Sequence, residues 1–169
     1  GDDKIVKLIG DREVVGIIVT HYHFDHIGAL DSLKSNFCVK KIINTSNFEE
    51  INIGDKVFKN LNVNSKRDND GSVILYGEYA SYKFLLMGDA SINIEKKIVD
   101  EIDGVDIINS SFGMLHPFES KIEKTLHIAS AGNLKCNLPH YPAACKDVVS
   151  VTGITEEGIL TNTSTYGDW

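Results

Sequence analysis

Three histidines and one aspartate fall within six residues near the start of the chain: His21, His23, Asp25 and His26. Alternate residues of an extended segment point the same way, so His21 and His23 can share one metal ion. A tight turn after them lets Asp25 and His26 face a second ion. Imidazole nitrogen and carboxylate oxygen are ligands that zinc and its neighbours prefer. The segment therefore predicts a metal site, with a histidine-rich surface loop as the alternative.

The residues around this segment predict elements that would present it at the end of a strand. The run 14–20 is short, apolar and rich in β-branched residues, which is typical of a strand buried on both faces. The segment 28–35 predicts a short helix with Leu30 and Leu33 facing inward. A strand followed by a helix is the context that a ligand motif of this kind needs.

Further along, strand and helix patterns alternate, and the fold class that we predict is α/β. Strand patterns occupy 39–44, 48–63 (two short strands around Gly54), 72–78 and 82–87 (a hairpin), 105–109, 126–131 and 148–153. Ser91 is a suitable N-cap for the helix that follows the hairpin. That helix would place Ile94, Ile98 and Ile102 on one face.

The composition is that of an ordinary soluble globular protein, with 42% apolar and 24% charged residues. The net charge of −7 does not attract a phosphate backbone, which counts against a nucleic-acid partner, although metal ions would offset it locally. No apolar run is long enough to span a bilayer, and the first residues lack a signal-peptide pattern. We therefore expect no membrane association and a cytoplasmic location. The sequence does not indicate an oligomeric state.

The three cysteines and two of the other histidines are predicted to have structural roles. Cys136 and Cys145 flank a short loop and could form a disulfide, but the odd count and the lack of a secretion signal favour free thiols. Cys38 opens an apolar segment and is predicted to pack as a small hydrophobe. His127 lies inside an apolar strand pattern and is predicted to be an interior or edge histidine, and His140 to lie in a turn.

The His-x-His-x-Asp-His segment after a strand resembles the signature of the metallo-β-lactamase-fold hydrolases. A second element also resembles the pattern of that family: the apolar strand 84–87 is followed by Gly88 and Asp89. In that family the aspartate at this place bridges two metal ions, and the resemblance assigns this role to Asp89. The preceding segment 68–76, which begins Asp68-Asn69-Asp70-Gly71, is similar to the competence-protein branch, which is associated with DNA uptake.

Two features depart from the pattern of that family. Only residues 1–12 lie upstream of the first predicted strand, where the family has its first strands. The later histidine that would complete the second metal shell has no motif-matched counterpart, and His116 is the only nearby candidate. The predicted site is therefore short of ligands.

The second half of the chain, about residues 94–169, resembles a different family, the subtilisin-like serine proteases. The segment 104–113 predicts a buried strand that ends in an Asn-x-Ser-x-Gly turn. The segment 129–133 matches the Ala-Gly-Asn segment of that family, whose asparagine side chain donates to the oxyanion. The segments 141–143, 148–153 and 163–167 then follow in the order that the family shows.

The rest of the serine-protease chemistry is missing from this sequence. Such an enzyme needs a nucleophile, a base and an orienting carboxylate, and the Asp-Thr-Gly, His-Gly-Thr and Gly-Thr-Ser-Met-Ala motifs that supply them do not occur. Asn133 is therefore carried over as a candidate catalytic residue only in the role of oxyanion donor. A turn residue after an apolar strand is an equally supported interpretation.

The two resemblances divide the chain into a partial metallo-β-lactamase-like αββα part at 1–100 and a partial subtilisin-like parallel α/β part at 101–169. No Pro- or Gly-rich linker marks the division, which rests on the resemblances alone. Both parts lack edge strands, and native proteins normally cover open sheet edges. We therefore expect the chain to represent segments of a longer protein, or a truncated or fused one.

The function that these observations favour is hydrolysis at a dinuclear site, with zinc as the expected metal and manganese or iron as alternatives. His21 and His23 would hold the first ion. Asp25 and His26 would hold the second, with Asp89 between the two, and Asp25 could also accept the proton of the attacking water. The substrate would be a phosphodiester, an ester or a peptide. The alternatives are a part of a larger subtilisin-like protease whose triad lies outside this chain, and a non-catalytic regulatory or scaffold protein with degenerate hydrolase domains.

Overall fold

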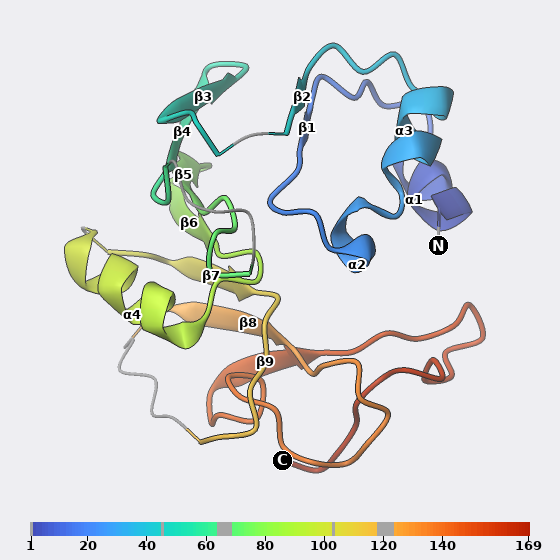
Figure 1. Cartoon of the computed structure of the whole chain (residues 1–169), viewed down its shortest axis with the longest axis vertical. Coiled ribbons are helices and arrows are strands. Elements are labelled where there is room, and N and C mark those ends of the chain that lie inside the picture. Colours follow the sequence, from blue (N-terminus) through green and yellow to red (C-terminus); the bar gives the residue numbers. More distant parts are fainter. Residues whose placement is uncertain (1, 45, 64–68, 103, 118–123) are drawn as a thin grey trace.

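Seven of the described strands form one mixed β-sheet that runs through the molecule (Figure 1). The computed structural model describes residues 2–44, 46–63, 69–102, 104–117 and 124–169. The strands lie in sequence order across the sheet: β3 (Glu50–Ile53), β4 (Lys56–Asn60), β5 (Leu75–Tyr79), β6 (Tyr82–Leu86), β7 (Ile107–Ser110), β8 (Leu126–Ser130) and β9 (Val148–Val151). Strands β3 to β6 pair antiparallel, and β6 to β9 pair in parallel. The α/β class predicted from the sequence is confirmed.

Tight turns set the register of the antiparallel half of the sheet. Gly54 joins β3 to β4 with a φ of +62°. Ala80 and Ser81 join β5 to β6 with φ of 51° and 68°, the left-handed conformation at both central residues that suits a two-residue hairpin. Gly77 in β5 leaves room for the ring of Phe58, because a Cβ there would lie 2.4 Å from the Phe58 Cδ1 atom. Both predicted strand pairs are therefore present.

The parallel half begins with a crossover helix, α4 (Ile92–Glu101), which connects β6 to β7. A parallel pair of strands needs such a crossover because a short turn cannot return the chain to the same end. Ser91 is the N-cap residue, as predicted, although its side chain makes no capping hydrogen bond. The helix covers one face of the sheet, at the left in Figure 1.

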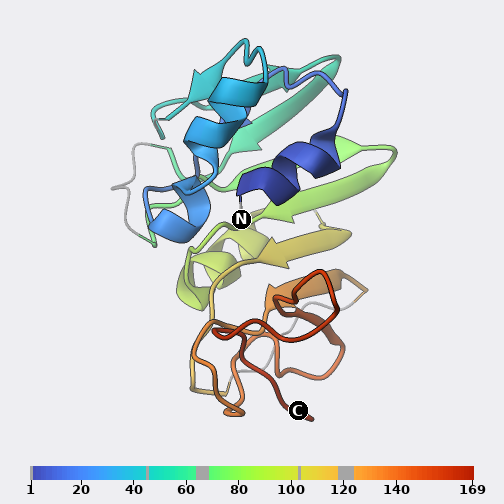
Figure 2. The same cartoon turned by 90° about the vertical axis from the view of Figure 1, so that its right-hand side faces the viewer.

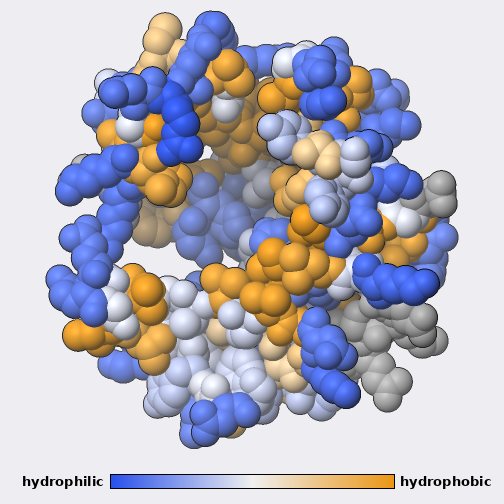
Figure 3. Space-filling view, turned by 180° about the vertical axis from the view of Figure 1, so that it is seen from behind, coloured by the Kyte–Doolittle hydropathy of each residue, from blue (hydrophilic) through white to orange (hydrophobic). Residues whose placement is uncertain are grey.

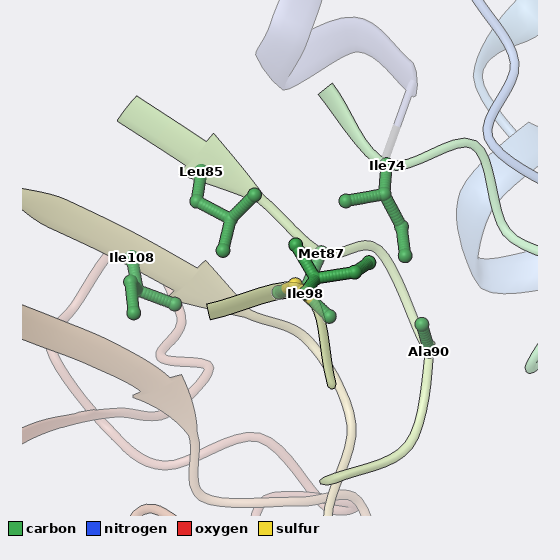
Figure 4. Close-up of a cluster of buried hydrophobic side chains, with 6 residues drawn as sticks. All are labelled: Ile74, Leu85, Met87, Ala90, Ile98 and Ile108. Carbon is green, nitrogen blue, oxygen red and sulfur yellow. The ribbon is translucent and has the colours of Figure 1, made fainter. Parts of the chain in front are cut away.

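The main hydrophobic core lies between α4 and this face of the sheet (Figure 4). Its buried members are Ile74, Leu85, Met87, Ala90, Ile98 and Ile108. Leu85 and Ile108 are register partners in β6 and β7, so their side chains lie on the same face. Ile98 of α4 packs onto them, with Ile94 and Ile102 partly buried at the margin of the cluster. The predicted apolar face of the helix is therefore confirmed.

The division predicted near residue 100 falls between two strands that pair with each other. Strand β6 precedes that position and β7 follows it, and Phe84 is the register partner of Ile107. The hydrophobic core also takes residues from both sides of the position, with Leu85 and Ile108 in contact range across the pair. The sheet is continuous through this region.

The N-terminal elements lie on the other side of the sheet from α4 (Figures 1 and 2). They are α1 (Asp2–Ile9), β1 (Ile17–Ile18), α2 (Phe24–Ile27), α3 (Leu30–Asn36) and β2 (Ile42–Ile43). The strand predicted over 14–20, buried on both faces, is wrong in extent and burial. Only two residues of β1 are paired, with β2 as the single neighbour, and Val15 is 49% exposed.

Two smaller predictions about this region have different outcomes. The predicted helix over 28–35 is present as α3, in which Leu30 and Leu33 are half-buried. Cys38 is exposed, so its predicted packing as a small hydrophobe is wrong, because it lies on the outward side of a segment whose Phe37 and Val39 are half-buried. Cys136 and Cys145 are not joined by a disulfide in the described structure, which is the outcome that the sequence favoured.

An apolar pocket of about 200 Å³ separates the two-stranded sheet from the hairpin of β3 and β4. Its lining includes Ile17, Ile18, Ile43, Ile51 and Ile53. Figure 3 shows a hollow in the molecule seen from behind, with apolar side chains along its margins.

None of the helices in the described ranges has the length and apolar character needed to cross a membrane.

Candidate functional site

Two segments far apart in the sequence bring potential metal ligands together. His21 and His23 lie in the loop after β1, and Asp89 lies in the loop after β6. One ligand atom from each of these three residues lies within 4.8 Å of the other two. The His21 Nε2 atom is 3.4 Å from Asp89 Oδ2, and the His21 and His23 rings are 4.7 Å apart between centroids.

The His21 ring is fixed by its Nδ1 atom and leaves Nε2 facing the other ligands. Nδ1 is 3.2 Å from Thr20 Oγ1 and 3.3 Å from Ser72 Oγ. The side chain is fully buried, and within the described part of the chain Nε2 has no hydrogen-bond partner. Burial, together with the nearby His26, lowers the pKa of His21. The neutral imidazole, which is the form that binds metals, is therefore favoured.

His26 approaches the other oxygen of the same aspartate. Its Nε2 atom is 2.9 Å from Asp89 Oδ1, and this hydrogen bond raises the pKa of His26. Asp25 lies at the rim, with its Oδ2 atom 3.9 Å from His26 Nε2 and its side chain 60% exposed. The five metal-ligand candidates, His23 included, are thus in one cluster. Asp89 is at its centre, with one oxygen toward His21 and the other toward His26.

The loop that carries Asp89 is held by the segment before β5. Gly88 has a φ of +56°, which turns the chain sharply after β6. The backbone N–H of Asp89 donates to Ser72 Oγ at 3.2 Å, and that of Ser91 donates to Asp70 Oδ1 at 2.9 Å. Asp70 belongs to the Asn-Asp-rich segment singled out in the sequence, of which Asp68 lies outside the described residues. Sequence reasoning missed Ser72, because a single serine gives no pattern.

The other histidines lie away from this cluster. His116 is exposed and is not among the residues whose ligand atoms meet at Asp89, within the ranges that the structure describes. His140 is in a turn, as predicted, with Ala144 N–H donating to its carbonyl oxygen at 2.7 Å. The sequence did not predict that its side chain is buried. The ring fits there because Gly113 and Gly132 have no side chain and leave space for it.

His127 belongs to a buried polar cluster on the face of the sheet that α4 covers. The Ser110 hydroxyl donates to Glu95 Oε2 at 2.7 Å and lies 2.9 Å from His127 Nε2. Because the Ser110 proton points to Glu95, His127 Nε2–H is the donor to Ser110. Burial lowers the pKa of His127 to about 4 and raises the pKa of Glu95. All three residues are buried, with at most 3% of their surface exposed, which confirms the predicted interior histidine.

Asn133 lies in the loop after β8 and is exposed. The carboxyl ends of parallel strands meet at one edge of a sheet, so the loops carrying Asp89, Ser111 and Asn133 follow β6, β7 and β8 at the same edge. Ser111 N–H donates to the Gly88 carbonyl at 3.0 Å and continues the strand pairing into these loops. Strands β6 and β8 are two strand spacings, or about 10 Å, apart. The two predicted sites therefore share one edge.

A family model described as the subtilase family matches residues 77–169, which is more than half of the chain. The chain belongs to the subtilase family. This matched region contains β6 to β9, α4 and Asn133, and it agrees with the subtilisin-like resemblance of the second half. It also begins upstream of residue 94, where that resemblance was first placed.

A second family model, the metallo-beta-lactamase superfamily, matches residues 2–63. This region contains His21, His23, Asp25 and His26, so the resemblance of the histidine segment is confirmed. Asp89 falls within the subtilase match instead. Its place beside the histidines therefore rests on the geometry of the folded chain.

Two solved structures similar to this chain are proteases by their descriptions. One is the self-cleaved protease domain of PatA, 26% identical, covering 44% of this chain and 32% of that chain, with a TM-score of 0.36. The other is the prenylagaramide maturation protease PagA, 25% identical, covering 45% of this chain and 31% of that chain, with a TM-score of 0.35. The aligned part is about a third of the length of those structures. No curated protein shows significant similarity to this chain.

Proposed function

We propose that this chain is a metal-dependent hydrolase that binds a divalent ion, zinc in the first instance, between His21, His23 and Asp89. The observation that carries the proposal is the convergence of their ligand atoms to within 4.8 Å of one another. The buried His21 Nε2 atom is also without a hydrogen-bond partner in the described residues, and a metal ion at this position would satisfy it. Two imidazoles and a carboxylate are a donor set that zinc accepts.

We further propose that His26 and Asp25 hold a second ion, with manganese and iron as alternatives to zinc. The support is the orientation of Asp89, whose two oxygens face different histidines. A carboxylate arranged in this way can serve two ions. Asp25 is at the exposed rim, where solvent and a substrate can reach it.

We propose that this site hydrolyses a phosphodiester, an ester or a peptide. We also propose that the protein is cytoplasmic. Divalent ions held by these residues would polarise the substrate oxygen and lower the pKa of water toward about 7. Among the groups of the chain, the two oxygens of Asp89 face His21 and His26, and Asp25 is placed to accept a proton.

Zinc binding tests this proposal, and we expect the His23→Ala variant to bind zinc at least about 100-fold more weakly than the unaltered chain. Loss of a hydrogen-bonding partner behind a ligand already weakens metal sites by about 10- to 100-fold, so loss of the ligand itself should cost more. Isothermal titration with zinc and the visible spectrum of the cobalt form measure the affinity and the donor set.

The matched control is His116→Ala, which removes an exposed histidine outside the cluster and should leave zinc binding unchanged. Failure of the unaltered chain to bind zinc or cobalt would overturn the proposal. Equal affinities for His23→Ala and the unaltered chain would do the same. Tight metal binding without turnover of any of the three substrate classes would favour a regulatory or scaffold role.

Membership of the subtilase family favours a second candidate function. We propose that Asn133, exposed at the carboxyl edge of the parallel strands, donates to an oxyanion in a larger protease whose triad lies outside this chain. A fluorophosphonate probe should label the full-length protein and leave the 169-residue chain unlabelled. Asn133→Ala in the full-length protein should slow turnover by about 100- to 1,000-fold. A full-length protein that resists the probe would remove this candidate.

A further inference from the structure

One buried hydroxyl connects two of the proposed metal ligands. Ser72 is fully buried, and its Oγ atom lies 3.3 Å from Nδ1 of His21. The same oxygen accepts the backbone N–H of Asp89 at 3.2 Å. The ligands that it contacts come from the loops after β1 and after β6, so the serine joins two segments that lie far apart in the sequence.

The backbone around Ser72 is built to hold it in this place. Val73 N–H donates to the Thr20 carbonyl at 3.0 Å, which fastens the segment to the residue before His21. On the other side Gly88 packs directly against the serine, because a Cβ at that glycine would lie 3.0 Å from Ser72 Cβ. The left-handed φ of Gly88 and this close approach both favour glycine. Ser72 is therefore enclosed between the two loops that it connects.

The hydroxyl group suits this place because it can donate one hydrogen bond and accept two. One acceptor position is taken by Asp89 N–H. The second can accept Nδ1–H of His21, and this tautomer leaves the Nε2 lone pair free for an ion. A partner behind a ligating histidine fixes its tautomer and its orientation, and usually strengthens the site.

We propose that Ser72 is a positioning residue that holds His21 and Asp89 at metal-binding distance and directs His21 Nε2 toward the ion. This inference rests on the proposed metal site. Thr20 Oγ1 also contacts His21 Nδ1, at 3.2 Å, but it is the chain neighbour of His21, and the hydrogen bond that joins the two loops is the one that Ser72 makes with Asp89. The two hydroxyls should therefore differ in their effect.

The test compares Ser72→Ala with Thr20→Val by zinc titration and by hydrogen exchange of the Asp89 amide in the metal-free protein. We expect Ser72→Ala to weaken zinc binding by about 10- to 100-fold and Thr20→Val by less. The Asp89 amide should exchange faster in Ser72→Ala only, because that variant alone removes its acceptor. Ser164→Ala is the matched control, since it removes another buried hydroxyl that bonds to Gly153 O, far from these ligands in sequence.

The two readouts separate this inference from the proposed function. If the unaltered chain binds no zinc, the proposed function fails, and the role of Ser72 at a metal site fails with it. If the unaltered chain binds zinc and Ser72→Ala binds it equally well, the positioning role alone is overturned. Unchanged exchange of the Asp89 amide in Ser72→Ala would also overturn it, whereas a weakening matched by Ser164→Ala would reduce it to a general effect on stability.

Discussion

Ile108→Ala is expected to lower the free energy of unfolding by about 3 to 4 kcal/mol. Ile108 is fully buried in β7, where its side chain packs under α4 with Leu85 of β6. The substitution removes three carbon atoms from a site enclosed on all sides and leaves a cavity that its neighbours cannot fully close. Urea unfolding followed by circular dichroism measures the change.

Leu126→Ala is the control for Ile108→Ala, because Leu126 lies at the start of the neighbouring strand β8 and is 47% exposed. It should cost about 1 kcal/mol or less, since much of its surface is already in water. Equal losses of unfolding free energy in the two variants would show that the residues packed under α4 do not form the main hydrophobic core. Because β6 and β7 pair across residue 100, we expect Ile108→Ala to lower the stability of the loops that carry the proposed metal ligands together with the subtilase part.

Acid is expected to destabilise the protein through His127 by about 3 kcal/mol between pH 7 and pH 4, relative to a His127→Gln variant. The pKa of His127 is lowered from 6.5 to about 4 because the ring is buried. Between these values the unfolded chain binds a proton at this position and the folded chain does not. Stability from this group is therefore fully present above pH 6.5 and is lost as the pH falls toward 4.

The measurement is the difference in unfolding free energy between the unaltered chain and His127→Gln, taken at several pH values. Glutamine keeps a donor toward Ser110 and does not titrate, so other pH effects cancel in the difference. His116→Gln, at an exposed position, should show no such trend. A difference that stays constant from pH 7 to pH 4 would contradict the prediction.

Glu95 affects the pH dependence of stability in the opposite direction to His127, and the Glu95→Gln variant isolates its contribution. Its pKa is raised by burial, so the folded chain takes up a proton at a higher pH than the unfolded chain. This group therefore destabilises the fold at neutral pH, and that cost is relieved as the pH falls through its folded pKa. Glu95→Gln should accordingly show a steeper loss of stability in acid than the unaltered chain.

The sequence predicted most elements of the sheet, because their signals are local. The hairpin of β5 and β6, the helix after Ser91 and the strands around Ile108 and His127 follow from periodicity and from turn residues. The strand over 14–20 was overestimated for a physical reason. Its apolar β-branched residues report a preference for extended structure, but pairing depends on a neighbouring strand, and β2 offers only two residues.

In the candidate site too, some residues could be predicted from local sequence patterns and others could not. The histidine segment could be found from spacing alone, and Asp89 from the resemblance to a strand that ends in Gly-Asp. The contact between Asp89 and both His21 and His26 depends on the path of the chain through β1 and β6, which no local pattern reports. Ser72 and the buried Glu95–Ser110–His127 cluster depend on tertiary packing for the same reason, and only the folded chain reveals them.

Strand β9 is the last strand in the described sheet, and its side chains Val149 and Val151 are 48% and 51% exposed. An edge strand generally presents backbone amide and carbonyl groups that can pair with a strand of another chain, and exposed apolar side chains favour such pairing. Strands that add in this way extend a sheet between molecules and promote precipitation at high concentration. We therefore expect a lysine at position 149 or 151 to reduce precipitation of this protein at high concentration.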